Sequence, residues 1–258
     1  MKKLIHKIAL VTGSDSGIGK AIAIEYAREG ATVIVCYHSD LDGAKETLTE
    51  VKVFSPESIL IKLDVSSEKD VEKKLDKVIA DFKGLDILVN NSGVNGSEIP
   101  LDEMPTAVFD TTIKTNLYGT FFCSRKFVQH RKMIKKPGKI INISSVHEEI
   151  IAPGNADYNA SKAGIRNLMR TLAIEVAPFG INVNNIAPGM ILTPMNQDAM
   201  DDIKKLKKAE KHIPLGRAGK SEEIAYLAVF LASAQADYVT GSTYVMDGGL
   251  MINIGQGA

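Results

Sequence analysis

The chain has no tryptophan, only two cysteines and no excess of charge of either sign. Its lysines and arginines number 31, as do its aspartates and glutamates. Zero net charge argues against a nucleic-acid or anionic-membrane partner, because both need a basic surface. Cys36 and Cys123 each lie in an apolar run, at a spacing that matches neither a disulfide framework nor a metal site. We expect two buried thiols and no bound metal.

Long apolar runs are also missing. Lysines precede apolar residues near the start of the chain, but the uninterrupted apolar run there covers only Ile8–Val11, too short for the core of a signal peptide. No stretch approaches the length of a membrane span. Apolar residues nevertheless make up 45% of the sequence, enough for a substantial core. These observations predict a soluble, cytoplasmic protein of 258 residues, a length that suits one α/β domain.

Short apolar runs alternate with amphipathic stretches along the chain. The runs have the length of buried strands, at Ile8–Val11, Thr32–Tyr37, Ser58–Leu63, Ile87–Val89, Lys139–Ile143, Asn182–Ile186 and Thr243–Met246. The stretches between them have helical periodicity, at Ile18–Glu29, Asp42–Val53, Glu68–Phe82, Ala107–Ile134, Tyr158–Ala177 and Ser221–Ser233. Such alternation builds a parallel sheet through right-handed crossovers. We therefore predict an α/β fold, with residues 1–258 forming a single Rossmann-like domain. Its doubly wound parallel sheet has about seven strands and helices on both faces.

One stretch interrupts the alternation, at about residues 193–217. It contains the pair Asp201 and Asp202 and the lysine-rich run KKLKK. A run of this kind is usually the solvated face of a short helix. A long insertion beside a site is also typical of a segment that covers a substrate. We predict a substrate lid at about 193–217.

A glycine-rich segment, Thr12–Gly19, joins the first expected strand to the first expected helix. Dinucleotide-binding folds hold the phosphates at this position, above the sheet and at a helix N-terminus. The glycines do not have the commoner GxGxxG spacing, but they meet the same need for a tight turn and close approach of the backbone. The residues expected to contact a dinucleotide here are Gly13, Ser16, Gly17, Ile18 and Gly19.

The end of the second strand bears on the choice of cofactor. NAD-binding proteins commonly place an Asp or Glu there against the adenosine ribose, whereas an Arg accommodates the 2′-phosphate of NADP. This chain has Tyr37 and His38 instead, and Asp15 and Asp40 are nearby negative charges that would repel a phosphate. We therefore predict NAD or NADP, with Tyr37 and His38 at the ribose.

Two further strand ends carry polar residues that can reach the same cofactor. After the third strand, Asp64 can meet the adenine amino group, or it can serve as the N-cap of the next helix. After the fourth strand, Asn90–Gly93 offers two amides and a flexible backbone, although an Asn-Asn pair is also typical of an ordinary turn. The residues expected to contact the cofactor at these ends are Asp64, Val65, Asn91, Ser92 and Gly93.

Tyr158 and Lys162 lie four residues apart, and therefore on one face of an expected helix. A free phenol has a pKa of about 10, and a neighbouring ammonium favours its ionised form. With a serine hydroxyl directed at the same substrate oxygen, the pair becomes an acid/base device for alcohols and carbonyls. Ser144 and Ser145, shortly upstream, are the candidate serines. Taken alone, Tyr and Lys at this spacing more often belong to an ordinary amphipathic surface.

Together these motifs resemble the short-chain dehydrogenase/reductase family over essentially the whole chain. Thr12–Gly19 looks like the family's cofactor loop, and Asn90–Gly93 resembles its NNAG signature with Ser92 in place of alanine. The segment PGMILT, residues 188–193, looks like the one that holds the nicotinamide. The family's serine-to-tyrosine spacing favours Ser145 over Ser144. The resemblance implies that the catalytic residues are Asn116, Ser145, Tyr158 and Lys162, and that Tyr158, Lys162, Pro188, Gly189, Ile191 and Thr193 also contact the cofactor.

The resemblance also implies a mechanism. Tyr158 exchanges a proton with the substrate oxygen while hydride passes between the substrate carbon and the nicotinamide. Ser145 holds the same oxygen, Lys162 favours the phenolate and contacts the nicotinamide ribose, and Asn116 links Lys162 to solvent through water.

Within the family, the segments SSVHE (144–148), YVTG (238–241) and DGG (247–249) look most like the bacterial glucose 1-dehydrogenases. This implies oxidation of an aldose sugar, with substrate contacts from Ser145, Asn95, His147 and Tyr158. Asn95 stands where the glucose enzymes usually have a Glu, and His38 where they have an Arg. A reductase of a 3-oxoacyl thioester or another ketone would use the same four catalytic residues. A regulator that binds NAD(P) without turnover would usually lack the Tyr or the Lys.

The resemblance further implies a homotetramer. Its interfaces would form through the helices expected at Ala107–Ile134 and Tyr158–Ala177, and through the last strand near Tyr244. Both helices are richly apolar, which suits an interface. The other expected partner is a small-molecule substrate.

Overall fold

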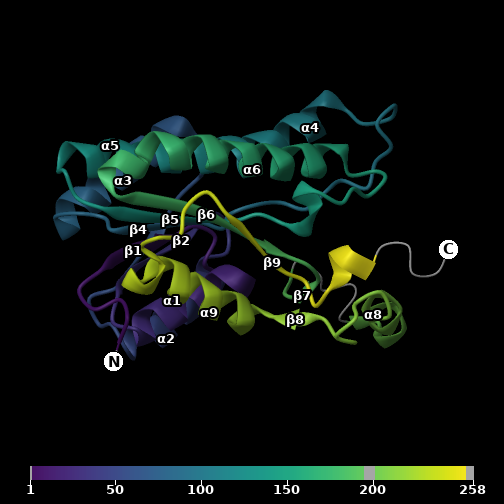
Figure 1. Ribbon diagram of the computed structural model, residues 1–258, viewed down its shortest axis with the longest axis horizontal. Coiled ribbons are helices and arrows are strands. Elements are labelled where there is room, and N and C mark those ends of the chain that lie inside the picture. The colour runs from purple at the N-terminus through teal and green to yellow at the C-terminus, as the bar shows by residue number, and fades with distance from the viewer. Residues whose placement is uncertain (1, 195–200, 254–258) are drawn as a thin grey trace.

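The computed structural model describes residues 2–194 and 201–253, and its centre is a seven-stranded parallel sheet (Figure 1). The strand order is β3-β2-β1-β4-β5-β6-β9. The strands are β1 (Ile8–Val11), β2 (Thr32–Tyr37), β3 (Ile59–Lys62), β4 (Ile87–Asn90), β5 (Gly138–Ile143), β6 (Ile181–Pro188) and β9 (Thr243–Met246). Each coincides with a predicted apolar run, and the predicted α/β fold with a doubly wound sheet is confirmed.

Helices cover both faces of the sheet. The layer drawn below it in Figure 1 contains α1 (Gly17–Arg28), α2 (Leu41–Lys52) and α9 (Ser221–Ala232). The layer drawn above it contains α3 (Glu68–Phe82), α5 (Gly119–Met133) and α6 (Ala156–Val176). A buried apolar cluster fills each interface between helices and sheet. The lower cluster includes Tyr26, whose hydroxyl donates to the Ala228 carbonyl oxygen at 3.0 Å and so links α1 to α9.

The central strands are apolar and buried on both sides, as parallel strands between two helical layers must be. From β1 the sheet is extended on one side by β2 and then β3. The chain then returns to the other side of β1 to form β4. This reversal opens a crevice at the carboxyl ends of β1 and β4, where open α/β sheets bind their ligands. It brings the predicted glycine loop beside the predicted Asn90–Gly93 turn.

The structure corrects the long helix expected at Ala107–Ile134. The segment starts as α4 (Thr106–Thr112), passes through a π-helical segment at Ile113–Tyr118, and continues as α5. A π-helical turn adds one residue to the helix and is frequent at functional sites. Apolar periodicity does not reveal this turn, because the side chain of Asn116 holds it through contacts distant in sequence.

The predicted lid begins and ends beside two short strands. These are β7 (Ile191–Leu192) and β8 (Gly219–Lys220), which pair with each other in parallel. Residues 195–200 of the predicted lid lie outside the described part of the chain. The lysine-rich run forms α8 (Ile203–Glu210), a short helix with exposed lysines. The solvated helix face is therefore confirmed, and a covering role for the segment stays a prediction.

No helix in the described ranges is long and apolar enough to span a membrane. Residues 2–194 and 201–253 also contain no group of three or more His, Cys, Asp or Glu that could hold a metal ion. Cys36 and Cys123 are both buried free thiols, as expected. Burial raises the pKa of the Cys123 thiol to about 12, so this group remains protonated at neutral pH.

A buried ion pair ties α5 to the amino-terminal edge of the sheet. Arg131 donates to the Asp86 carboxylate at 3.0 Å, to the Leu85 carbonyl oxygen at 3.1 Å and to the Pro137 carbonyl oxygen. Asp86 also accepts the backbone N–H of Ile8 at 2.9 Å. The guanidinium thus contacts the chain just before β4 and just before β5.

Replacing Arg131 with Met should lower the free energy of unfolding by about 3 kcal/mol, because Asp86 then loses its buried counter-charge. Urea unfolding of the purified protein measures this loss. Lys77→Met is the matched control, since Lys77 pairs with Asp81 at 2.8 Å on the surface of α3. The control should change stability by less than about 1 kcal/mol. Equal losses in the two variants would show that the Arg131 pair contributes no more than a surface pair.

Candidate active site

The glycine loop has the geometry of a phosphate cradle. Gly13 and Gly17 have φ angles of +58° and +54°, a region that side-chain-bearing residues rarely adopt. A Cβ on Gly19 would lie 2.2 Å from the Gly13 carbonyl oxygen, so this position also requires glycine. Ser16, the N-cap of α1, makes no side-chain capping bond. The first turn of α1 therefore keeps backbone N–H groups available for an anion, and the residues present fit a dinucleotide.

Asn91 holds this loop in place from the end of β4. Its side-chain amide donates to the carbonyl oxygens of Thr12 and Gly13 at 3.0 and 2.7 Å. In return, the Thr12 hydroxyl accepts the backbone N–H groups of Asn91 and Ser92, both at 2.9 Å. The Asn-Asn pair is thus more than an ordinary turn, because Asn91 clamps the cradle. Sequence reasoning missed Thr12, although its place at the end of β1 was a usable signal.

Charged groups gather near the end of β2, where the ribose was predicted. Burial, and to a lesser degree the neighbouring Asp40 carboxylate, raises the pKa of Asp15, while His38 acts in the opposite direction. Asp40 is the N-cap of α2, and its carboxylate accepts the Gly43 N–H at 3.0 Å. Tyr37 is half-buried and His38 is exposed. Two acidic side chains and one imidazole thus share this corner, and no arginine stands beside His38 in the sequence.

Asp64 is not the N-cap of the next helix. The N-cap of α3 is Ser67, whose hydroxyl accepts the Asp70 N–H at 3.3 Å. Asp64 instead accepts the backbone N–H and the hydroxyl of Ser66, at 2.9 and 2.7 Å. Val65 is buried against the start of α5, since a Cβ on Gly119 would lie 2.8 Å from its Cγ2. A contact between these residues and adenine stays a prediction.

Asn116, in the π-helical segment, joins three parts of the site. Its side-chain oxygen accepts the Val94 N–H at 2.8 Å. Its side-chain nitrogen donates to the Val94 carbonyl oxygen and to the Ser161 hydroxyl, both at 3.1 Å. A Cβ on Gly93 would lie 3.2 Å from the Asn116 side-chain oxygen and 3.9 Å from the Lys162 nitrogen. The loop after β4 therefore passes close to both predicted catalytic groups, as only a glycine at 93 allows without displacement.

A second bond joins the end of α4 to the start of α6. The Thr112 hydroxyl, at the end of α4, donates to the Asp157 carboxylate at 2.8 Å, and Asp157 is fully buried. Asp157 directly precedes Tyr158, so the start of α6 is fixed on both sides of the tyrosine. The sequence offered no signal for this pair, because the two residues are 45 positions apart.

Tyr158 and Lys162 lie together on α6, as their spacing predicts. The Lys162 nitrogen is 5.3 Å from the centre of the Tyr158 ring and donates to the Ile143 carbonyl oxygen at 3.2 Å. The His147 ring meets the Tyr158 ring edge-on, with centres 5.7 Å apart. One nitrogen of His147 lies 3.0 Å from the Ile150 carbonyl oxygen, which fixes the imidazole in this orientation.

The structure separates the two candidate serines. The Ser144 hydroxyl donates to the Ile186 carbonyl oxygen at 3.2 Å and is occupied within the sheet. The Ser145 hydroxyl accepts the His147 N–H at 3.2 Å, at the start of the 3₁₀ turn Val146–Glu148. A hydroxyl that accepts one bond still has its own proton to donate. Ser145 is therefore the serine that can donate to a substrate oxygen.

The remaining predicted residues lie around these groups. Thr193 packs against the glycine loop, since a Cβ on Gly17 would lie 3.3 Å from the Thr193 Cβ. The segment that begins at Pro188, at the end of β6, and includes Gly189 and Ile191 leads to it. Asn95 is exposed in the loop between Val94 and Gly96. A Cβ on Gly96 would overlap the Asn155 side chain, so this loop rests on the residue that precedes α6.

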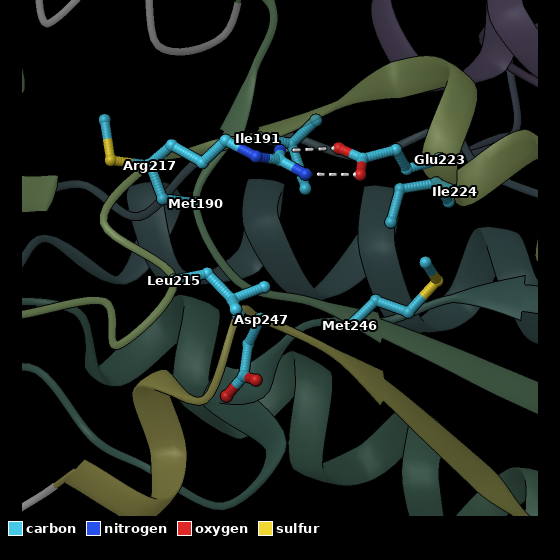
Figure 2. A pocket seen from close by; sticks show the side chains of 10 residues that line it. Met190, Ile191, Leu215, Arg217, Glu223, Ile224, Met246 and Asp247 are labelled. Atoms are coloured by element: carbon cyan, nitrogen blue, oxygen red, sulfur yellow. Dashed lines mark hydrogen bonds and ion pairs between the residues drawn. The ribbon is translucent and has the colours of Figure 1, made fainter.

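A separate cavity of about 120 Å³ lies between the predicted lid and β9 (Figure 2). Arg217 and Glu223 form two hydrogen bonds on one side of it, at 2.9 and 2.7 Å, and Met246 and Asp247 lie on the other. The Arg217 guanidinium lowers the pKa of Glu223 to about 2. None of the four predicted catalytic residues lines this cavity. The Arg217–Glu223 pair beside this cavity connects the end of the predicted lid to α9. The cavity itself is separate from the predicted acid/base groups.

Comparison with known proteins agrees with this geometry. The family model described as Enoyl-(Acyl carrier protein) reductase matches residues 13–251. The chain is 42% identical to glucose 1-dehydrogenase 2 of Bacillus subtilis over 251 residues, 97% of each protein. It is 41% identical to 3beta-hydroxysteroid dehydrogenase 1 of Eggerthella lenta over 255 residues, again 97% of each. Among solved structures, a candidate 2-deoxy-D-gluconate 3-dehydrogenase from Agrobacterium tumefaciens with bound NADP has a TM-score of 0.89 at 34% identity. That alignment covers 97% of this chain and 98% of the other.

Replacing Asn91 with Ala should weaken binding of the reduced dinucleotide by roughly ten-fold, because two carbonyl oxygens of the cradle lose their donor. Fluorescence titration with NADH and NADPH measures this directly. Asn95→Ala, an exposed amide in the following loop, is the control and should bind both dinucleotides like the unaltered protein. Unchanged affinity in Asn91→Ala would mean that the clamp does not shape the phosphate site.

Proposed function

Because the chain belongs to the short-chain dehydrogenase/reductase family, we propose that it oxidises an aldose sugar, such as glucose, at its C1 hydroxyl. Membership makes the protein an NAD(P)-dependent oxidoreductase acting on CH–OH groups. The proposal concerns the substrate. It is carried by the edge-on contact of His147 with Tyr158, which puts an imidazole beside the predicted proton acceptor, while the backbone N–H of the same histidine donates to the Ser145 hydroxyl. A substrate with several hydroxyl groups can use both polar groups at once.

The chain's own residues supply the binding site for the cofactor. The glycine loop and the first turn of α1 would hold the pyrophosphate, and Thr193 would lie beside it near the nicotinamide. When bound there, NAD or NADP would supply the acceptor for the hydride from the sugar C1. The carboxylates of Asp15 and Asp40 disfavour the additional ribose phosphate of NADP, whereas His38 favours it. The proposal therefore includes both NAD and NADP.

The proton of the C1 hydroxyl goes to Tyr158 in this proposal. The hydrogen on C1 leaves as a hydride, with the electron pair of the C1–H bond, and the hydroxyl proton passes to Tyr158. The electrons of the broken O–H bond form the C=O bond of the lactone product. The Lys162 nitrogen lies 5.3 Å from the centre of the Tyr158 ring, so a positive charge faces the proposed proton acceptor. Ser145 donates a hydrogen bond to the C1 oxygen of the sugar. Asn116 fixes the spacing between α6 and the loop after β4 through its bonds to Val94 and Ser161.

Initial rates for a panel of aldoses, steroids and 3-oxo esters, each with both cofactors, test the substrate directly. The proposal predicts the highest kcat/KM for an aldose. A 3-oxo ester or steroid with a kcat/KM about ten-fold above every sugar would contradict it, since ten-fold corresponds to about 1.4 kcal/mol of transition-state binding. Turnover of any panel member excludes a regulator that binds the cofactor without catalysis.

Tyr158→Phe tests the acid/base assignment independently of the substrate. Loss of the hydroxyl should reduce kcat by about 10²–10⁴-fold, the usual contribution of a positioned proton-transfer group. Tyr226→Phe is the matched control, because Tyr226 lies exposed on α9. Unaltered turnover by Tyr158→Phe would remove the tyrosine from the mechanism.

One observation favours a second candidate, the reduction of a 3-oxoacyl thioester. The helix α8 presents the lysines of KKLKK to solvent at the predicted lid. Acidic carrier proteins would be attracted to such a surface. The same panel separates the two candidates, because this reading predicts that the 3-oxo esters are the best substrates.

We also propose that the protein is a homotetramer assembled through α5, α6 and β9. A groove of about 730 Å³ runs between α5 and α6 and is lined by both apolar side chains, such as Phe121 and Leu172, and polar ones, such as Arg125. The strand β9 ends the sheet, with Val245 exposed. Exposed apolar patches and an unpaired strand edge are both typical of surfaces that a second subunit covers.

Sedimentation equilibrium should return about four times the chain mass of 27.9 kDa. Phe121→Glu should dissociate this assembly, because it buries a charge in the groove. Phe54→Glu is the matched control, since Phe54 and Phe121 are 40% and 38% exposed but lie on different faces. A monomer, or equal behaviour of the two variants, would contradict the proposed assembly.

A further inference from the structure

A row of buried amides crosses the sheet below the site and ends on a carboxylate. Asn90, Asn142 and Asn185 are register neighbours on β4, β5 and β6. The Asn90 amide donates to the Asn142 side-chain oxygen at 2.8 Å, and the Asn142 amide donates to that of Asn185 at 2.9 Å. Asn185 in turn donates to the Glu148 carboxylate at 3.3 Å. Every amide donates in the same direction, so the row presents a donor to Glu148.

Glu148 is buried at a cost that its own hydrogen bonds do not offset. Its side chain is 2% exposed, and one carboxylate oxygen has no hydrogen-bond partner. The oppositely charged group beside that oxygen is Arg166, whose Nε lies 3.9 Å away. Removing a carboxylate from water costs several kcal/mol unless it is well paired. A buried group so sparsely bonded calls for an explanation beyond stability.

The position of Glu148 in the chain supplies an explanation for its buried carboxylate. It ends the 3₁₀ turn that starts after Ser145, and its backbone N–H donates to the Ser145 carbonyl oxygen at 3.0 Å. His147 lies between the two. The carboxylate of Glu148 therefore attaches the turn that carries the hydroxyl and the imidazole to Asn185 on strand β6.

Arg166 attaches the same turn to the catalytic helix, through Glu149 at 2.8 Å and Glu148 at 3.9 Å. It follows Lys162 by four residues and Tyr158 by eight, so the three side chains leave α6 along one stripe. Glu148 therefore sits between β6 and the helix that carries the tyrosine.

We propose that Glu148 is a positioning residue for the reaction. Held between Asn185 and Arg166, its carboxylate sets how far Ser145 and His147 lie from Tyr158. This inference rests on the proposed acid/base function of those residues. A displacement of about 1 Å in such a site can cost about 10²-fold in rate, so loss of the carboxylate should affect turnover more than binding.

The test compares Glu148→Ala, Glu148→Gln and the control Glu222→Ala in the full-length protein, with D-glucose or the panel member that is turned over fastest. Glu148→Ala should lower kcat by about 10- to 100-fold, while the dissociation constant of NADH or NADPH stays within about two-fold. Glu148→Gln retains an acceptor for Asn185 and should recover most of that loss. Glu222 has the same charge but is exposed in the first turn of α9, on the opposite face of the sheet from α6, and its removal should leave kcat within about two-fold.

Three outcomes would overturn the inference. The first is a normal kcat in Glu148→Ala while Tyr158→Phe is inactive, a result that leaves the proposed function intact. The second is a loss of kcat accompanied by an equal loss of cofactor affinity and thermal stability, which would make the role structural. The third is full activity in Tyr158→Phe, which would remove the proposed function as well. If Glu148→Ala does not fold, Arg166→Gln replaces it, because Arg166 is 34% exposed. Arg166→Gln should also lower kcat with unchanged cofactor affinity, and a normal kcat in that folded variant would overturn the inference.

Discussion

The arrangement of the site depends on the side chain of Asn116. From a π-helical turn it makes hydrogen bonds to both backbone groups of Val94 and to the hydroxyl of Ser161. These bonds fix the loop after β4 against α6, and with it the distance from the sheet to Tyr158 and Lys162. Each buried bond contributes only about 1 kcal/mol to stability, but an unsatisfied amide at this depth would cost more. The bond from Thr112 to Asp157 acts in the same direction at the start of α6.

The same principle holds the rest of the crevice together. Polar side chains at the carboxyl ends of adjacent strands are buried or half-buried, and each makes hydrogen bonds to a neighbouring strand or loop of the protein. Asn91 shapes the glycine loop, Ser144 closes the gap to β6, and the row from Asn90 to Asn185 reaches Glu148. The Ser145 hydroxyl still has its own proton to donate on this fixed frame, whereas the Asn116 amide is fully used in holding the frame together. A nicotinamide-dependent oxidation needs such a frame, because the cofactor supplies the chemistry and the protein supplies position and charge.

Much of this could be predicted from the sequence, for a definite physical reason. Strand and helix alternation, the glycine loop and the Tyr158–Lys162 spacing are local patterns, and the fold and the helix face follow from them. The π-helical turn could not be predicted, because its cause lies in bonds from Asn116 to residues 22 and 45 positions away. The difference between Glu148 and Glu149 could not be predicted either. The two are adjacent residues of the same type, but the side chain of Glu148 is buried and that of Glu149 is exposed. The spacing to Tyr158 already favoured Ser145 over Ser144, and the bond from Ser144 to the Ile186 carbonyl oxygen adds the physical reason.

A crystal structure of the protein with oxidised cofactor and an aldose bound would test the central claim most directly. The account predicts the sugar C1 oxygen within about 3 Å of both the Tyr158 and the Ser145 hydroxyls, with His147 at another hydroxyl of the sugar. A sugar bound with its C1 oxygen away from Tyr158, for example in the cavity beside Arg217, would contradict it.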